Sequence, residues 1–104
     1  VVPASQALAM ATLNGARALG IDNKVGSIEP GKQADLIAID LEHPRTQPVY
    51  DPCSTLTYSA AASQISHVWV DGQALVVNHQ LTRMDLAQVL EEARRWGAGI
   101  AAGA

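Results

Sequence analysis

The segment ISHVWVDGQALVV, residues 65–77, limits the possible folds of this chain more than any other stretch. Asp71-Gly72 stands between two runs of β-forming residues, which predicts a two-residue hairpin with strands at residues 65–70 and 73–77. A regular register pairs Val70 with Gln73, Trp69 with Ala74, Val68 with Leu75 and His67 with Val76. Both faces of this ribbon are then apolar, so other elements must cover it on both sides.

A further strand is predicted at residues 34–41, and it has the same property. Leu36 and Ala38 lie on one side of it, and Ile37 and Ile39 lie on the other. The covering layers must therefore come from elsewhere in the chain or from outside it.

Three helical segments are predicted around these strands. The first runs from about Pro3 or Ser5 to Leu19, and its packing stripe comprises Leu8, Ala11, Thr12, Gly15 and Leu19. Asp51-Pro52 predicts an N-cap and a short helix to about residue 61. Asp85 is expected to cap a helix over residues 86–98, followed by a frayed tail. The buried stripe of that last helix would comprise Leu86, Val89, Leu90, Ala93 and Trp96.

Composition indicates that this cover is thin. The chain has 104 residues, no Phe and only 4% aromatic residues, so few side chains can bury large areas. Its helices can supply little apolar surface to two double-faced strand segments, which predicts that part of the fold lies outside the chain. The start of the sequence does not have the pattern of a signal peptide. It also lacks an initiator Met, which fits a chain that begins inside a longer protein.

The charge of the chain limits the classes of partner it can bind, and its cysteine content indicates its compartment. A net charge of −3 with seven scattered Lys and Arg residues gives no basic face, so neither nucleic acid nor a membrane is expected as a partner. No apolar run approaches the roughly 20 residues of a membrane span. Cys53 is the single cysteine and cannot form an internal disulfide, which favours a cytoplasmic location.

The segment GSIEPGKQ, residues 26–33, differs at one residue from the sequence pattern of a phosphate-binding loop, G-x-x-x-x-G-K-[ST]. Gln33 replaces the hydroxyl residue that ligates Mg²⁺, Pro30 lacks a backbone N–H, and Glu29 repels an anion. The loop also leads into a strand rather than a helix. The preferred interpretation is a type II turn at residues 29–32, with nucleotide binding kept as a minor hypothesis.

The three histidines do not form a metal-binding pattern. The sequence contains no H-x-H or H-E-x-x-H, and a continued hairpin would place His67 and His79 on opposite faces, roughly 10 Å apart. His67 is interpreted as a partly buried strand residue and His79 as a turn residue, while His43 matches no motif. No metal ligand is therefore assigned to this chain.

Catalytic candidates are equally weak. Cys53 near a helix N-terminus could be a reactive thiolate, but a small buried apolar residue is the preferred interpretation. Asp35 and Asp40 flank a strand and could share acid and base roles, although such positions usually hold solvated carboxylates. No G-x-S-x-G motif surrounds the candidate serines Ser54, Ser59, Ser63 and Ser66. No catalytic residue is assigned, and the substrate-binding residues are unknown.

The segment LNGARALGIDNKVGSIEPGKQADLIAID resembles the closing segment of the amidohydrolase superfamily. The shared patterns are N-x-A-x-x-L-G and then G-x-I-x-x-G-x-x-A-D-L. They fall on Asn14, Ala16, Leu19, Gly20, Gly26, Ile28, Gly31, Ala34, Asp35 and Leu36. YDPCSTLTYSA and ISHVWVDGQALV are similar to the next segments of the branch with S-adenosylhomocysteine and 5′-methylthioadenosine deaminases and triazine and ammeline hydrolases.

The resemblance implies an α+β fragment, the C-terminal part of a composite β-sandwich with the last helix of a (β/α)8 barrel and a terminal helix. Residues 1–20 would be the barrel helix, and residues 21–50 would be sandwich strands. Residues 51–62 would return toward the barrel, residues 63–84 would form the sandwich hairpin, and residues 85–104 would form the C-terminal helix and tail. The missing barrel and N-terminal strands would be its partners, and a homo-oligomer is possible.

The resemblance further implies a metal-dependent deaminase of adenosine derivatives, in which a divalent ion, usually zinc, activates water to attack an aminated ring carbon. The histidines and the aspartate that hold this ion precede the matched region. This fragment would then bind no cofactor and would serve as scaffold. The alternative is a freestanding, non-catalytic α+β interaction module.

Overall fold

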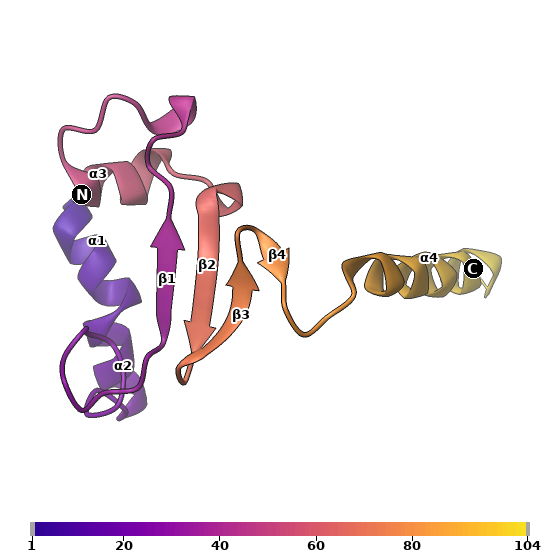
Figure 1. Ribbon diagram of the computed structural model, residues 1–104, viewed down its shortest axis with the longest axis horizontal. Coiled ribbons are helices and arrows are strands. Elements are labelled where there is room, and N and C mark those ends of the chain that lie inside the picture. The colour runs from indigo at the N-terminus through magenta and orange to yellow at the C-terminus, as the bar shows by residue number, and fades with distance from the viewer. Residues whose placement is uncertain (1, 104) are drawn as a thin grey trace.

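The computed structural model describes residues 2–103 as a group of helices beside one antiparallel sheet, followed by a helix that stands apart (Figure 1). The sheet has the strand order β1-β2-β3-β4. Its strands are β1 Leu36–Ile39, β2 Ile65–Val70, β3 Gln73–Val77 and β4 Gln80–Leu81. The longer helices are α1 Ala4–Ala11, α2 Leu13–Leu19 and α4 Leu86–Gly103. This is the mixed helix and antiparallel sheet expected from the sequence.

The hairpin of β2 and β3 is confirmed, but its register differs from the regular one. Val70 pairs with Gln73 and Trp69 with Ala74, as predicted, whereas Val68 pairs with Val76. Leu75 is thus the extra residue of a β-bulge. The predicted pairs of Val68 with Leu75 and of His67 with Val76 are wrong.

Both faces of the sheet are apolar, as predicted. Ile37 of β1 lies opposite Val68 and Val76 follows on β3, so these three residues form a row on one face. Leu36, Trp69 and Ala74 form the equivalent row on the other face. Because of the bulge, Val76 shares a face with Val68, whereas the predicted regular register would have placed it on the face of Trp69.

β4 is an element that the sequence did not reveal. The chain turns at Asn78 and His79, which have positive φ values of 48° and 65°, and returns so that Val77 pairs with Gln80. The His79 backbone N–H donates to the Ser66 carbonyl over 2.9 Å. His79 is therefore a turn residue, as predicted.

The first predicted helix is interrupted at Thr12. Its φ of −124° and ψ of −99° are not helical, so α1 and α2 replace the single helix expected to Leu19. The Thr12 hydroxyl donates to the Leu8 carbonyl over 2.8 Å, a bond that competes with the backbone and bends helices. Gly20 ends α2 with the expected left-handed conformation, φ 73°.

Short helical segments connect β1 to β2. They are η1 Pro44–Thr46, α3 Pro52–Ser54, the π-helical η2 Thr55–Ser59 and η3 Ala62–Gln64. Asp51 caps α3 by accepting from the Cys53 backbone N–H over 3.1 Å, as predicted. The helix ends before Ala60, whose extended backbone breaks it short of the expected residue 61.

A buried polar cluster holds these connections to the end of β1. Gln64 is only 3% exposed, and its amide nitrogen donates to the Asp40 carbonyl over 3.0 Å and to the Thr46 hydroxyl over 3.1 Å. Its amide oxygen accepts from the Ala61 backbone N–H over 2.9 Å. Thr46, also 3% exposed, donates to the Leu41 carbonyl over 2.8 Å. The cluster therefore satisfies its polar atoms internally.

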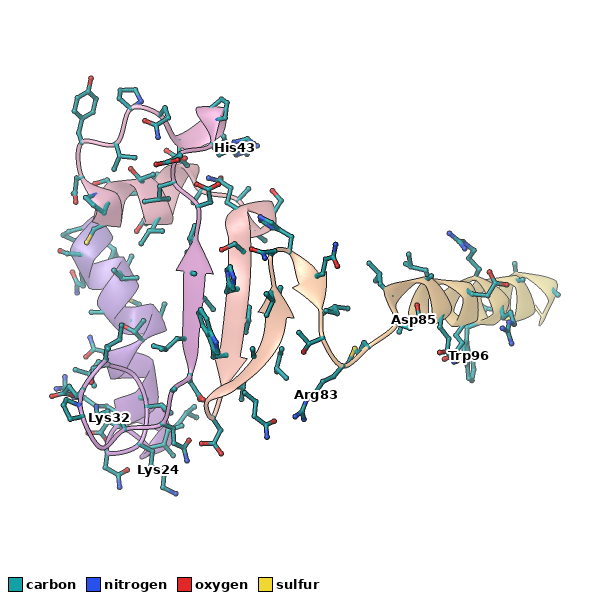
Figure 2. All side chains as sticks on the ribbon, viewed as in Figure 1. Lys24, Lys32, His43, Arg83, Asp85 and Trp96 are labelled. Carbon is teal, nitrogen blue, oxygen red and sulfur yellow. The ribbon has the colours of Figure 1, made fainter. Side chains whose placement is uncertain are left out.

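α4 begins where Asp85 accepts from the Gln88 backbone N–H over 3.2 Å, which confirms the predicted cap. The helix continues to Gly103, so the expected frayed tail is helical in the described residues. Its stripe is not buried: Leu86, Val89 and Trp96 are exposed, and Trp96 projects from the side of α4 (Figure 2). The predicted burial fails because α4 stands apart from the layers it was expected to cover.

The surface is large for a chain of 10.9 kDa. It exposes 7836 Å², whereas a compact monomer of this mass exposes about 5,600 Å². The radius of gyration is 17.7 Å, against about 13 Å for a compact domain of this length. Within residues 2–103, Ala16 is the one buried apolar residue, and many large apolar side chains, among them Leu19, Ile28 and Ile37, remain exposed. None of the described helices is long and apolar enough to span a bilayer.

Candidate functional site

The histidines occupy structural positions. His67 is half-buried in β2 and stacks on Trp69 with ring centroids 5.5 Å apart, which confirms its interpretation as a strand residue. His43 accepts from the Arg45 backbone N–H over 3.1 Å. Within residues 2–103, no three His, Cys, Asp or Glu side chains gather closely enough to hold a metal ion. The described residues therefore do not fit the zinc site that the family resemblance implies.

The other catalytic candidates also serve local structure. Cys53 is half-buried at the start of α3, and the Ser54 hydroxyl donates to the Asp51 carboxylate over 2.9 Å. The Ser66 hydroxyl donates to the Ala38 carbonyl over 3.4 Å. The Ser59 carbonyl accepts from the Arg45 side chain over 3.3 Å. The Ser66 Oγ also lies 2.8 Å from the Nδ1 of His67, its neighbour in β2. Within residues 2–103, Cys53, Ser54 and Ser59 have no histidine among their hydrogen-bond partners.

Asp35 and Asp40 have separate structural partners. Asp35 accepts from the Asp71 backbone N–H over 2.7 Å and so ties the start of β1 to the hairpin turn. Asp40 accepts from the Glu42 backbone N–H over 2.9 Å. The two carboxylates thus close turns at opposite ends of β1, as expected for residues at strand ends, and do not form an acid and base pair.

The GSIEPGKQ segment forms the predicted turn. The Lys32 backbone N–H donates to the Glu29 carbonyl over 3.2 Å, and Gly31 has a φ of 90°, as a type II turn requires. The Lys32 ammonium lies 3.1 Å from the Glu29 carboxylate and 2.6 Å from the Ser27 hydroxyl. The Lys32 ammonium is thus bonded within its own loop and does not point to a phosphate-binding role.

This loop carries a pH-dependent prediction. Hydrogen bonds from Ser27 and Lys32, together with the Lys32 charge, lower the pKa of the exposed Glu29 carboxyl below its ordinary value of 4.5. Because the folded pKa is depressed, the contribution to stability is present above the unfolded pKa and is lost as pH falls through the folded pKa. We expect NMR titration of Ser27→Ala to show a higher Glu29 pKa than the unsubstituted chain. An unchanged pKa contradicts the assignment of Ser27 as the main cause.

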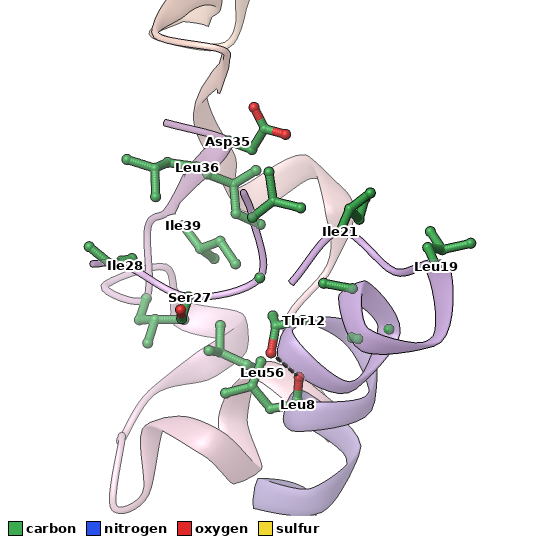
Figure 3. A pocket seen from close by; sticks show the side chains of 17 residues that line it. Leu8, Thr12, Leu19, Ile21, Ser27, Ile28, Asp35, Leu36, Ile39 and Leu56 are labelled. Carbon is green, nitrogen blue, oxygen red and sulfur yellow. Dashed lines mark hydrogen bonds between the residues drawn. The ribbon is translucent and has the colours of Figure 1, made fainter. Parts of the chain in front are cut away.

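A concave surface lies between the α1–α2 pair and β1, and we call it the α2–β1 groove (Figure 3). Its volume is about 750 Å³. One wall consists of Leu8, Ala11, Thr12, Gly15, Ala16 and Leu19 from the helices. The remaining lining residues come from the segment after α2, from β1 and its ends, and from η2: Ile21, Val25, Gly26, Ser27, Ile28, Asp35, Leu36, Ile37, Ile39, Leu41 and Leu56. All five residues of the predicted first stripe line the groove, whereas the opposite wall depends on tertiary contacts that the sequence does not display.

The polar side chains of the α2–β1 groove already have partners. Thr12 donates to the Leu8 carbonyl (Figure 3), Ser27 bonds to Glu29 and Lys32, and Asp35 accepts from Asp71. The groove is therefore mainly aliphatic, and its one carboxylate, the exposed Asp35, is bonded to the hairpin turn through one of its oxygens. Its chemistry suits the docking of another apolar surface and not catalysis.

Comparison with known proteins gives one family and a consistent set of relatives. Residues 1–75 match the model described as "Amidohydrolase family". A 5-methylthioadenosine/S-adenosylhomocysteine deaminase of Teredinibacter turnerae is 44% identical over 95 residues, which cover 91% of this chain and 22% of the relative. A 5′-deoxyadenosine deaminase of Methanosarcina acetivorans is 43% identical over 93 residues, covering 89% of this chain and 21% of the relative.

Solved structures agree with these relatives. An adenosine deaminase from Xanthomonas campestris with bound zinc superimposes with a TM-score of 0.94 at 42% identity, covering 98% of this chain and 23% of that chain. An atrazine chlorohydrolase from Arthrobacter aurescens, complexed with zinc, has a TM-score of 0.82 at 30% identity, covering 90% of this chain and 20% of that chain. The chain thus spans between a fifth and a quarter of the length of the proteins it matches.

Proposed function

The chain belongs to the amidohydrolase family, and from that premise we propose that it is the C-terminal scaffold of a metal-dependent deaminase of adenosine derivatives. The observation that carries the proposal is the identity of 44% to a methylthioadenosine and adenosylhomocysteine deaminase over 91% of this chain. Such a parent enzyme hydrolyses a C–N bond on a purine-like ring. The residues that hold its metal would lie outside this chain, because the described residues offer no ligand set.

The proposed organisation follows the family resemblance. Residues 1–20 would be the last barrel helix, residues 21–50 and 63–84 would belong to a β-sandwich, and residues 51–62 would return toward the barrel. Residues 85–104 would form the terminal helix. The two apolar faces of the sheet support this organisation, because each needs a covering layer that this chain does not supply. A cytoplasmic location is proposed from the single cysteine, which cannot form a disulfide within the chain.

A freestanding interaction module is less well supported. A self-sufficient module of 104 residues would bury a contiguous apolar core, whereas Ala16 is the one buried apolar residue among residues 2–103. The radius of gyration of 17.7 Å also exceeds that of a compact domain. Both observations favour a segment that completes its core with other parts of a longer protein.

A hybrid enzyme tests the proposal. We define the hybrid deaminase as the Teredinibacter turnerae relative whose matching segment, 22% of its length, is replaced by residues 1–104. We expect it to release ammonia from 5′-methylthioadenosine within about tenfold of the rate of the relative, because volume-conserving core exchanges are usually tolerated. The relative truncated before this segment is the negative control, and we expect it to be inactive.

Two further outcomes separate the hypotheses. A folded hybrid deaminase with the metal content of the relative but no ammonia release contradicts the scaffold role. A sharp, cooperative unfolding transition of monomeric residues 1–104 alone, with little binding of a hydrophobic dye, contradicts the incomplete core and favours the freestanding module.

A further inference from the structure

We propose that Asp71 is a modification site, at which aspartate converts spontaneously to isoaspartate once the two residues before β1 release the hairpin turn. The inference concerns the turn between β2 and β3, and it does not depend on the proposed function. It gives Asp35, whose carboxylate is bonded to this turn, the role of a protecting residue.

The reaction uses two adjacent groups of the Asp71-Gly72 turn. The Gly72 backbone nitrogen attacks the side-chain carboxyl carbon of Asp71, a C–N bond closes a five-membered succinimide ring, and one water molecule leaves with the proton of that nitrogen. Water then adds to one of the two ring carbonyls and opens the ring. Opening at one C–N bond restores aspartate, and opening at the other leaves the main chain running through the side-chain carboxyl, which is isoaspartate. Solvent water is the co-reactant, and nothing is oxidised or reduced.

The position of Asp71 favours this reaction. Asp71 is the one aspartate of the chain that precedes a glycine, and Gly72 has no side chain that could hinder ring closure. Asp71 and Gly72 are both exposed, so water, which must add to the ring, reaches them. The turn is therefore chemically open to the modification.

Two hydrogen bonds hold the backbone of the turn in place. The Asp71 N–H donates to the Asp35 carboxylate over 2.7 Å, and the Gly72 N–H donates to the Ala34 carbonyl over 3.0 Å. Peptide planes are rigid, and those on both sides of Asp71 are anchored, so its dihedral angles change little while both bonds hold. Ring closure requires the Gly72 nitrogen to lose its proton and to turn toward the Asp71 side chain, so the bonds oppose it.

The Asp35 bond is the part of this anchor that a side chain supplies. A bond from a backbone N–H to a carboxylate is among the stronger hydrogen bonds of proteins, and 2.7 Å is short for an N–H···O contact. Asp35 and Asp71 are both exposed, so the turn can open locally without unfolding of the sheet. Loss of the Asp35 carboxylate should therefore increase the fraction of time that the turn is open.

Isoaspartate at residue 71 would disrupt the hairpin. It adds one carbon to the main chain of a two-residue turn, in which the φ values of Asp71 and Gly72 are 49° and 76°. Such a turn matches the twist of its strands only with its normal backbone length. The pairing of Val70 with Gln73 beside the turn would then be lost.

Ageing of the hybrid deaminase tests the inference. The purified protein is kept at neutral pH and physiological temperature, and isoaspartate at residue 71 is followed by peptide mass spectrometry after labelling with an isoaspartyl methyltransferase. Asp35→Ala removes the bond to the turn, whereas Asp35→Asn keeps an oxygen that can accept it. Asp40→Ala is the matched control, because Asp40 is an exposed carboxylate at the other end of β1 that accepts from the Glu42 backbone N–H over 2.9 Å.

Asn14-Gly15 provides an internal control in the same samples. Deamidation at Asn14 follows the same ring closure, but it starts from an amide, releases ammonia and is detected by a gain in mass. Asn14 lies in α2 and not in the hairpin turn. Its rate therefore reports general unfolding and not the opening of that turn.

We expect Asp35→Ala to raise the rate of isoaspartate formation at residue 71 by about fivefold or more, because the turn loses its bond to a charged acceptor. Asp35→Asn should show a smaller increase, and Asp40→Ala should match the unsubstituted hybrid. The deamidation rate at Asn14 should be the same in all four proteins.

Three results overturn the inference. If isoaspartate at residue 71 forms equally fast in Asp35→Ala and in the unsubstituted hybrid, the Asp35 bond does not protect the turn. If deamidation at Asn14 rises in parallel with isoaspartate at residue 71, general unfolding is the cause. If no variant forms isoaspartate at residue 71, Asp71 is not a modification site.

Discussion

Gln64→Leu is expected to destabilise the hybrid deaminase by about 3 kcal/mol, because it leaves buried polar groups without partners. The substitution keeps the size of the side chain but removes the acceptor of the Ala61 N–H and the donor to the Asp40 carbonyl. Gln64 is 3% exposed, so water cannot readily replace these bonds. A lower melting temperature, measured by calorimetry, reports the loss.

Gln88→Leu is the matched control for this prediction. Gln88 lies on the exposed surface of α4, where its amide makes one long bond of 3.5 Å to Glu92. The same chemical change there should alter stability by no more than about 0.5 kcal/mol. If the two variants melt alike, the cluster around Gln64 does not hold the connections between β1 and β2.

Thr46→Val extends the test within the same cluster. Its hydroxyl donates to the Leu41 carbonyl and accepts from Gln64 over 3.1 Å. Because the two side chains share this bond, the double variant should cost less than the sum of the single variants. Strict additivity contradicts the coupling.

Gly26→Ala is the second large effect, with an expected cost of about 3 kcal/mol. Gly26 has a φ of 103°, and an added Cβ would lie 2.8 Å from the Ala16 Cβ and 3.0 Å from the Leu13 Cα. The new methyl group therefore combines backbone strain with a collision against α2. The loop must move away from the helix, which opens one wall of the α2–β1 groove.

Gly31→Ala separates the two causes. Gly31 has a similar φ of 90°, but nothing lies within 4 Å of an added Cβ. We expect a cost of about 1–2 kcal/mol, from backbone strain alone. The melting temperature of the Gly26→Ala hybrid should therefore be lower than that of the Gly31→Ala hybrid, because only Gly26 lies close to α2. Equal melting temperatures contradict a destabilising collision with α2.

The sequence predicted the elements whose signals are local. Asp71-Gly72 specifies its turn by backbone preference, so the ends of β2 and β3 were predicted correctly. Asp51 and Asp85 cap the helices that follow them for the same reason. The turn at residues 29–32 needed only Pro30 and Gly31.

The errors arise where distant segments decide the structure. At Thr12 the local bond of its hydroxyl to the Leu8 carbonyl coincides with the approach of the Gly26 loop to the start of α2, and helix propensity does not encode that approach. The bulge at Leu75 occurs where β4 returns to β3, and Leu75 accepts from the Thr82 N–H over 3.0 Å. The stripe of α4 was predicted from its period, but periodicity does not name the surface on which a helix packs.

The candidate site shows the same division. The helical wall of the groove follows from the spacing of the first stripe, from Leu8 to Leu19. The hydrogen bond between Asp35 and Asp71 connects residues 36 positions apart, so no local sequence pattern could predict it.

α4 is joined to the sheet by residues 82–85, and its 18 residues span about 27 Å. A rotation of α4 by about 10° at its first turn would displace its last turn by roughly 5 Å. Leu90, Trp96 and Ile100 are exposed along this helix. A small change in the backbone of the connecting residues would therefore displace Ile100 further than Leu90, because Ile100 lies closer to the far end.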